Sequence, residues 1–240
     1  AMDIINSKPA LSDFGALVSA KELDCKQTGW GISPIIGAHF SYKNLNVGAK
    51  FEFKTKLNVE NNMKVNTTGL AEFDDGVNTP HDIPALFTIG ASYRIIPRLT
   101  VSAGYHHFFD SNAKMASDKQ KFINGGTNEY LGGAEFKIND MFLVSGGFQI
   151  TRQGVKDDYQ RDLSFALNSY SIGFGGAVKV APKVKINIGY FWTTYSDWTN
   201  QIADYGNINR LAGGKIPATG GTDVFSRTTT VFAAGVGFSF

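Results

Sequence analysis

The last eleven residues alternate large apolar side chains with small ones and end on an aromatic residue. Successive side chains on a β-strand point to opposite faces, so alternate residues share a face. One face carries Phe232, Ala234, Val236, Phe238 and Phe240, and the other carries Val231, Ala233, Gly235, Gly237 and Ser239. The first face suits lipid and the second suits a barrel lumen, which is typical of the strand that closes a membrane β-barrel.

The same alternation recurs along the chain and predicts about ten strands, each near the length of about 9–11 residues that a membrane-spanning strand needs. The predicted strands cover residues 14–22, 30–42, 45–54, 87–95, 99–109, 130–138, 142–151, 171–179, 184–193 and 230–240. Pro34 interrupts the second of them, where we expect a kink because proline lacks an amide hydrogen. The mean hydropathy of -0.13 excludes a membrane-spanning helix but does not exclude strands, because only half of a strand's residues face lipid.

The connections between the predicted strands distinguish a barrel from a soluble β-sandwich, whose strands also alternate. Short turns at residues 43–44, 96–98, 139–140 and 181–183 alternate with long loops at 59–82, 110–127, 153–164 and 197–226. Outer-membrane barrels have short periplasmic turns and long extracellular loops. We therefore predict an all-β protein, an antiparallel transmembrane β-barrel of the outer membrane that forms a single domain over residues 1–240.

Aromatic residues gather at both ends of the predicted strands, as in the two interfacial girdles of membrane barrels. Those near the short turns are Tyr42, Tyr93, Phe136, Phe142, Phe238 and Phe240, and those near the long loops are Trp30, Tyr105, Phe109, Tyr130 and Trp192.

Charge and composition argue against several other functions. The formal net charge is +2 and the basic residues are scattered, which disfavours nucleic-acid binding. Cys25 is the single cysteine, so no zinc site built on paired cysteines is predicted, and no cofactor is implied. The pairs Asp74-Asp75 and Asp157-Asp158 lie in long loops, where solvated surface is the expectation and a calcium site is the alternative. His106 and His107 are neighbours on a strand and point to opposite faces, so they cannot readily bind one metal. A barrel hydrolase or protease with a site at the extracellular rim stays an alternative, as does a structural or adhesive barrel.

Two resemblances give the prediction a family. Gly235, Phe238 and Phe240 resemble the C-terminal signal read by the outer-membrane assembly machinery, with Ala233 in place of the usual polar residue. The run from Gly29 to Leu57, with residues 83–93 and 99–105, is similar to the C-terminal part of the FadL/TodX family of hydrophobic-substrate transporters. That resemblance implies a barrel of fourteen strands with an N-terminal hatch, which passes long-chain fatty acids or aromatic hydrocarbons passively across the outer membrane.

The chain departs from this family pattern in two ways. It has no hatch segment with the Asn-Pro-Ala signature, and only about ten predicted strands. We expect an N-terminally truncated form of a longer transporter, and a natural barrel of ten strands is the alternative. We further expect a monomer that contacts lipid and is not an enzyme.

Candidate substrate contacts follow from the parity of the predicted strands. Apolar side chains on the lumenal face would contact a hydrophobic substrate or, alternatively, simply fill a narrow barrel. They are Ile35, Phe108, Leu131, Leu143 and Phe191. A fatty-acid carboxylate would need a cation, and the lumenal candidates are Lys50, Arg94, Lys137 and Lys185, with Lys179 beside them.

Overall fold

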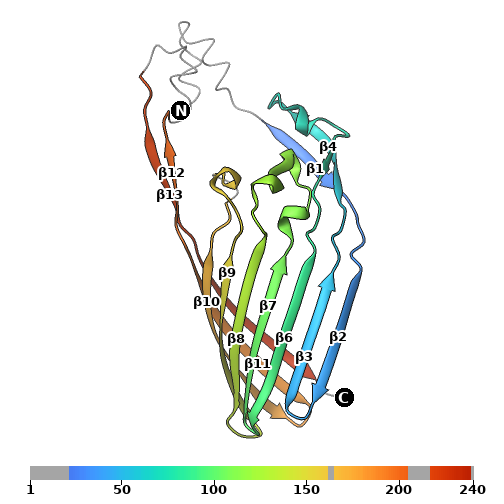
Figure 1. Ribbon diagram of the computed structural model, residues 1–240, viewed down its shortest axis with the longest axis vertical. Helices are drawn as coiled ribbons and strands as arrows, with labels where there is room; N and C mark the ends of the chain where they lie inside the picture. Colours follow the sequence, from blue (N-terminus) through green and yellow to red (C-terminus); the bar gives the residue numbers. More distant parts are fainter. Residues whose placement is uncertain (1–21, 162–164, 205–216, 239–240) are drawn as a thin grey trace. The chain divides into compact units, whose positions relative to one another are not determined.

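A computed structural model describes residues 22–161, 165–204 and 217–238, which are mostly antiparallel strands (Figure 1). No helix within these ranges has the length and apolar character needed to cross a membrane. The chain divides into two compact units, the larger formed by residues 30–58, 80–196 and 226–240 and the smaller by residues 1–29, 59–79 and 197–225.

The larger unit contains a sheet of nine antiparallel strands in the order β14-β11-β10-β9-β8-β7-β6-β3-β2. Their bounds are β2 (Ile35–Tyr42), β3 (Leu45–Glu52), β6 (Leu86–Ile96), β7 (Leu99–Phe108), β8 (Thr127–Lys137), β9 (Phe142–Arg152), β10 (Ser169–Ala181), β11 (Val184–Tyr195) and β14 (Thr228–Phe238). Strands that follow one another in this unit are neighbours in the sheet, so the topology is a simple meander. The four predicted short turns are confirmed, joining β2 to β3, β6 to β7, β8 to β9 and β10 to β11.

Nine predicted strands therefore have a counterpart in this sheet, with one correction of substance. The strand predicted at residues 30–42 begins only at Ile35, directly after Pro34. Pro34 donates no amide hydrogen, although its carbonyl accepts the Phe53 N–H at 2.9 Å. The expected kink within the strand is thus wrong, because the proline precedes the strand. The strand predicted at residues 14–22 falls outside the described residues, apart from Glu22.

The smaller unit contains strands that we did not predict, most of them within predicted loops. Strands β1 (Leu23–Thr28), β4 (Asn58–Asn66) and β5 (Asn78–Pro80) form a three-stranded sheet, while β12 (Trp198–Ile202) pairs with β13 (Gly221–Phe225). The loops predicted at 59–82 and 197–226 are thus wrong in part. Periodicity did not reveal β4 because it is rich in polar residues. Buried Asn61 instead accepts a hydrogen bond from Gln27 at 2.8 Å and donates one to the Glu72 carbonyl at 2.9 Å.

Two connections of the larger unit pack against each other through short 3-10 turns. The β7–β8 connection carries η3 (Asp110–Asn112) and η4 (Ala116–Phe122), and the β9–β10 connection carries η5 (Asp157–Tyr159). A further 3-10 turn, η2 (Ala71–Phe73), belongs to the smaller unit. The Lys119 ammonium lies 4.2 Å from the centre of the Tyr159 ring, between η4 and η5. Burial, helped by the charge of Asp110, raises the pKa of Tyr159. These loops are therefore ordered by contacts of their own.

The nine-stranded sheet has one apolar face that runs across all of its strands. The register sets Phe136 opposite Val144, Phe148 opposite Ile172, and Tyr190 opposite Phe232, all on this face. Its side chains are exposed, with Phe174 at 65% and Phe232 at 71%. Among the described residues, the buried apolar ones are only Ala113, Ile123, Leu167 and Ala177. A β-sandwich would bury such a face against a second sheet, so the sandwich alternative is wrong.

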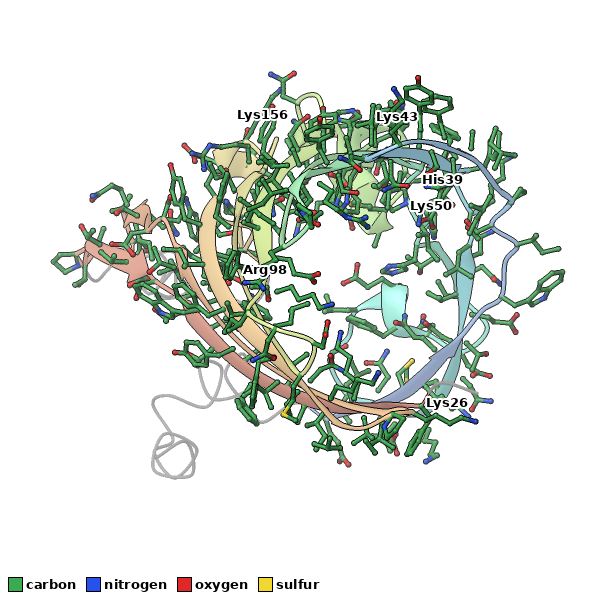
Figure 2. All side chains as sticks on the ribbon, turned by 90° about the horizontal axis from the view of Figure 1, so that it is seen from below. Lys26, His39, Lys43, Lys50, Arg98 and Lys156 are labelled. Atoms are coloured by element: carbon green, nitrogen blue, oxygen red, sulfur yellow. The ribbon has the colours of Figure 1, made fainter. Side chains whose placement is uncertain are left out.

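The other face of the sheet is polar and concave. Figure 2 looks along the strands and shows His39 and Lys50 projecting toward the inner side of the curved sheet. Both residues alternate with the apolar set, His39 opposite Gly48 and Lys50 opposite Gly37. The apolar face is consequently convex. Phe51, Val144 and Ile186 lie on it. The described residues of β14 that we predicted to face lipid also lie on it: Phe232, Ala234, Val236 and Phe238.

Candidate binding site on the concave face

Glycines form the floor of the concave face in its central strands. Gly133 of β8 is paired with Gly147 of β9, which is paired in turn with Gly173 of β10. A Cβ atom on Gly147 would lie 2.9 Å from the Gly132 carbonyl oxygen, closer than ordinary van der Waals contact. The strands therefore approach one another in a way that larger residues would prevent, and the floor is free of side chains.

Two adjoining hollows lie over this floor. We call the one of about 460 Å³ the upper hollow and the one of about 660 Å³ the lower hollow. The upper hollow is lined by Ser102, Ala103, Gly104, Leu131, Gly132, Gly133, Gly147, Phe148, Gln149, Ser171, Gly173 and Phe191. The two share Ser102, Gly133, Gly147, Gly173 and Phe191. Their size is that of pockets that bind small molecules.

The five predicted substrate residues all lie on the concave face, as the parity requires. Leu131 is paired with Gly104 and Gln149, and Phe191 with Gly173 and Val231. Leu131 and Phe191 line the upper hollow, and Phe191 also lines the lower one. Ile35, Phe108 and Leu143 are not among the described residues that line the two hollows. The structure thus brings two of the five together, and substrate contact by any of them stays a prediction.

The predicted carboxylate partners lie away from these hollows. Lys50 forms an ion pair with Glu52 at 2.5 Å, and Lys137 forms one with Asp140 at 2.7 Å. The hydrogen bond and the charge of Lys137 lower the pKa of the Asp140 carboxyl. Lys185 is paired with Lys179 in the register, near the turn that joins β10 to β11. The described lining of both hollows includes neither these lysines nor Arg94, so a role in carboxylate binding also stays a prediction.

A hydrogen-bonded polar cluster occupies the concave face toward the long loops. Glu129 of β8 is at its centre and contacts side chains of β7 and β9. Its Oε2 lies 2.9 Å from His106 Nδ1, and its Oε1 accepts the Gln149 amide at 2.9 Å and the Thr151 hydroxyl at 3.4 Å. Ser171 is paired with Gln149 in the register, and its hydroxyl lies 2.7 Å from the Thr193 hydroxyl. The cluster meets the upper hollow at Gln149 and Ser171.

Sequence reasoning did not identify this cluster as a site. The signal that could have found it is the series of polar residues at the loop ends of consecutive strands, all with lumenal parity: His106, Glu129, Gln149, Ser171 and Thr193. The separation of the two histidines was predicted and is confirmed. His106 contacts Glu129 on the concave face, whereas His107 Nδ1 lies 2.9 Å from the Asn128 side-chain oxygen on the convex face.

A hydrolytic site would need a hydroxyl or thiol beside the histidine, in addition to the carboxylate that orients it. Within the described ranges, the hydrogen bonds of His106 include Glu129 and no Ser or Thr hydroxyl. The described residues also contain no group of three His, Cys, Asp or Glu side chains suited to a metal ion. The arrangement can hold a polar group of a ligand, but it does not assemble a nucleophile and base.

The assembly-signal residues are only partly described. Gly235 is paired with Asn187 and Phe238 with Val184, and the Phe238 side chain is 65% exposed on the convex face. Phe240 lies outside the described residues. Recognition of these residues by assembly machinery stays a prediction.

No protein-family model and no curated protein sequence matches the chain. Solved structures do match it. A FadL homologue of Pseudomonas aeruginosa superposes with a TM-score of 0.59 at 16% identity, over 85% of this chain and 51% of that one. The toluene transporter TodX of P. putida superposes with a TM-score of 0.53 at 13% identity, over 88% of this chain and 50% of that one. The chain thus spans about half the length of these proteins, and its fold is that of the corresponding part of a FadL/TodX-type β-barrel.

Proposed function

We propose that the chain is part of an outer-membrane protein through which hydrophobic small molecules pass without an energy source. The observation that carries the proposal is the pair of faces on one sheet. The convex face exposes large apolar side chains across the sheet, and the concave face holds hollows with apolar and polar walls. Large exposed apolar surfaces are rare on soluble monomers, and lipid is the solvent that suits them.

The passage of a hydrophobic molecule requires apolar walls inside an otherwise polar lumen. Leu131 and Phe191 provide such walls over a floor of glycine backbone. The likeness in fold to a toluene transporter supports the same class of cargo. Long-chain fatty acids are the substrate expected from the sequence, and aromatic hydrocarbons are the second class. Both have an apolar body, but only the fatty acid needs a cationic partner.

Uptake of labelled oleate and labelled toluene by cells tests the proposal. The cells lack their own transporters of these compounds and carry the full-length protein or a variant at matched surface levels. Burial of a side chain such as Phe191 against a ligand contributes about 1.5–3 kcal/mol, so Leu131→Asp or Phe191→Asp should lower uptake roughly ten- to a hundredfold. Leu143→Asp is the matched control, because Leu143 shares the concave face but lines neither hollow.

The two substrates separate the finer hypotheses. Fatty acids are supported as the substrate if cells take up oleate and if this uptake falls when Lys50 or Lys185 is replaced by Gln. Uptake of toluene alone supports hydrocarbons. Uptake of both compounds at the level of cells without the protein would contradict transport and leave a structural or adhesive barrel.

A further inference from the structure

One wall of the upper hollow is polar, and its amide group is held in one orientation. Gln149 Nε2 lies 2.9 Å from Glu129 Oε1 and 3.3 Å from Thr151 Oγ1. Only the N–H side of an amide can donate to an ionised carboxylate, so these contacts fix which end of Gln149 faces Glu129. Among the described residues, Gln149 Oε1 takes part in no hydrogen bond, and Gln149 lines the hollow. The wall thus offers a carbonyl oxygen to a ligand.

The groups behind and beside Gln149 are acceptors as well. Glu129 is an acidic residue, and its side chain is only 19% exposed. His106 Nδ1 lies 2.9 Å from Glu129 Oε2, so the second carboxylate oxygen also has a hydrogen-bond partner. In the Ser171 and Thr193 pair, one hydroxyl donates to the other, so the pair keeps free lone pairs and one unused hydroxyl hydrogen. The wall is therefore rich in acceptors and lies near a partly buried anion.

An anionic ligand group would meet repulsion at this wall. The cations of the concave face lie outside the described lining of the hollow, where Lys50 and Lys137 are paired with acidic residues. Arg94, Lys179 and Lys185 lie at strand ends next to the short turns. A neutral hydroxyl has the complementary chemistry, because it donates one hydrogen bond to an acceptor and brings no charge close to Glu129.

We infer that the upper hollow binds hydrophobic molecules that carry a neutral hydroxyl, such as a phenol or an alcohol, and that it discriminates against carboxylates. The inference rests on the proposed function and names its substrate class. The hydroxyl donates to Gln149 Oε1, and the apolar body lies between Leu131 and Phe191 over the backbone of Gly147 and Gly173. Gln149 thus sets the preference for a neutral hydroxyl, and Glu129 positions the side-chain amide of Gln149.

Three probes of nearly equal shape test the inference: p-xylene, p-cresol and p-toluate. Each has a methyl group on a benzene ring, with a methyl, a hydroxyl or a carboxylate opposite. Their binding to the purified full-length protein in lipid nanodiscs is measured by equilibrium dialysis at neutral pH, after subtraction of binding to empty nanodiscs. We expect p-cresol to bind roughly three- to tenfold more tightly than p-xylene, the strength of one neutral hydrogen bond. We expect p-toluate to bind at least about tenfold more weakly than p-cresol, because of charge repulsion.

Two variants assign the effect to this wall. Gln149→Leu should bring the affinity ratio of p-cresol to p-xylene to about one, since it removes the acceptor. Glu129→Gln should raise the affinity for p-toluate about tenfold, since it removes the negative charge. Asn187→Leu is the control, because it makes the same kind of change on the concave face outside both hollows, and it should leave the ratios as in the wild type.

The outcomes separate the inference from the proposed function. The inference is overturned if p-toluate binds as tightly as p-cresol, if Gln149→Leu keeps the preference for p-cresol, or if no probe binds above empty nanodiscs. Transport of toluene or oleate by cells, together with any of these results, would leave the proposed function standing. If cells show no uptake but the purified protein binds p-cresol specifically, transport is rejected and the hollow remains a binding site.

Discussion

Two neighbouring residues of β11 offer a direct test of which solvent covers each face of the sheet. Ile188 lies on the convex face, opposite Gly176 and Ala234, and is 56% exposed. Asn187 lies on the concave face, opposite Ala177 and Gly235. The perturbation is the introduction of a lysine at one position or the other. The two variants carry the same charge at nearly the same depth along the strand and differ only in face.

The expected magnitudes differ because the solvents differ. A lysine at the lipid-facing midplane of a barrel costs about 2–4 kcal/mol. At about 1.4 kcal/mol for each factor of ten, Ile188→Lys should lower the folding equilibrium constant roughly thirty- to seven-hundredfold. If water covered the convex face, a substitution at so exposed a position would change the stability by only about 0.5 kcal/mol. Asn187→Lys faces the polar lumen, so a change of about 0.5 kcal/mol is expected there in either case.

The assay is reversible unfolding by urea of the full-length protein in lipid vesicles, followed by the mobility difference between folded and unfolded barrel. Both variants and the wild type are measured in the same vesicles, so differences in the denatured state largely cancel. If the two lysines lower the free energy of unfolding equally, or if Asn187→Lys lowers it more, the assignment of the convex face to lipid is refuted. A large cost at Ile188 alone would confirm it.

Two further predictions concern the loops and the chain end. The carboxylate of Asp82, 6% exposed, accepts the backbone N–H groups of Leu57 and Lys114, each at 3.1 Å. Burial raises the pKa of Asp82, but these two N–H groups and Lys54 outweigh it and hold the pKa below its usual range. A depressed pKa means that the carboxylate stabilises the fold above its unfolded pKa of about 3.9, and that this contribution is lost as the pH falls through the folded pKa. Asp82→Asn should therefore lower the local stability by about 1–3 kcal/mol at neutral pH and by little in acid. The measurement is amide hydrogen exchange at Leu57 and Lys114, which should be faster in the variant. Equal exchange in the variant and the wild type would contradict the prediction. Deletion of Phe240 should lower the amount of barrel in the outer membrane several-fold by quantitative blotting, and an unchanged amount would remove its role in assembly.

The sequence was sufficient to predict which strands pair across a short turn. Leu131 and Gln149 lie on either side of the turn at residues 139–140, and Ser171 and Thr193 on either side of the turn at 181–183. A short turn joins neighbouring antiparallel strands, so period-two parity and turn position together give the face of each residue and the strand beside it. The two faces of the sheet followed from the same argument.

Pairings across the long loops could not be predicted. His106 meets Glu129 only because the connection between β7 and β8 folds on itself, and its length leaves the register open. The polar cluster, and with it the acceptor wall of the upper hollow, depends on that pairing. Strand β4 was missed for another reason, since buried side-chain amides rather than apolar residues stabilise it, as at Asn61.

The glycine floor makes the concave face unusually easy to fill and hard to enlarge by mutation. A Cβ atom on Gly104 would lie 3.6 Å from the Ile89 carbonyl oxygen and 3.7 Å from Leu131, which is ordinary contact, so an alanine there would take one methyl group from the upper hollow without moving a strand. At Gly147 the same change would press on the Gly132 carbonyl at 2.9 Å and force β8 and β9 apart. A floor without side chains has no atoms left to remove. Single substitutions in the floor can therefore make the upper hollow smaller, whereas a larger hollow requires a change in the walls or in the number of strands.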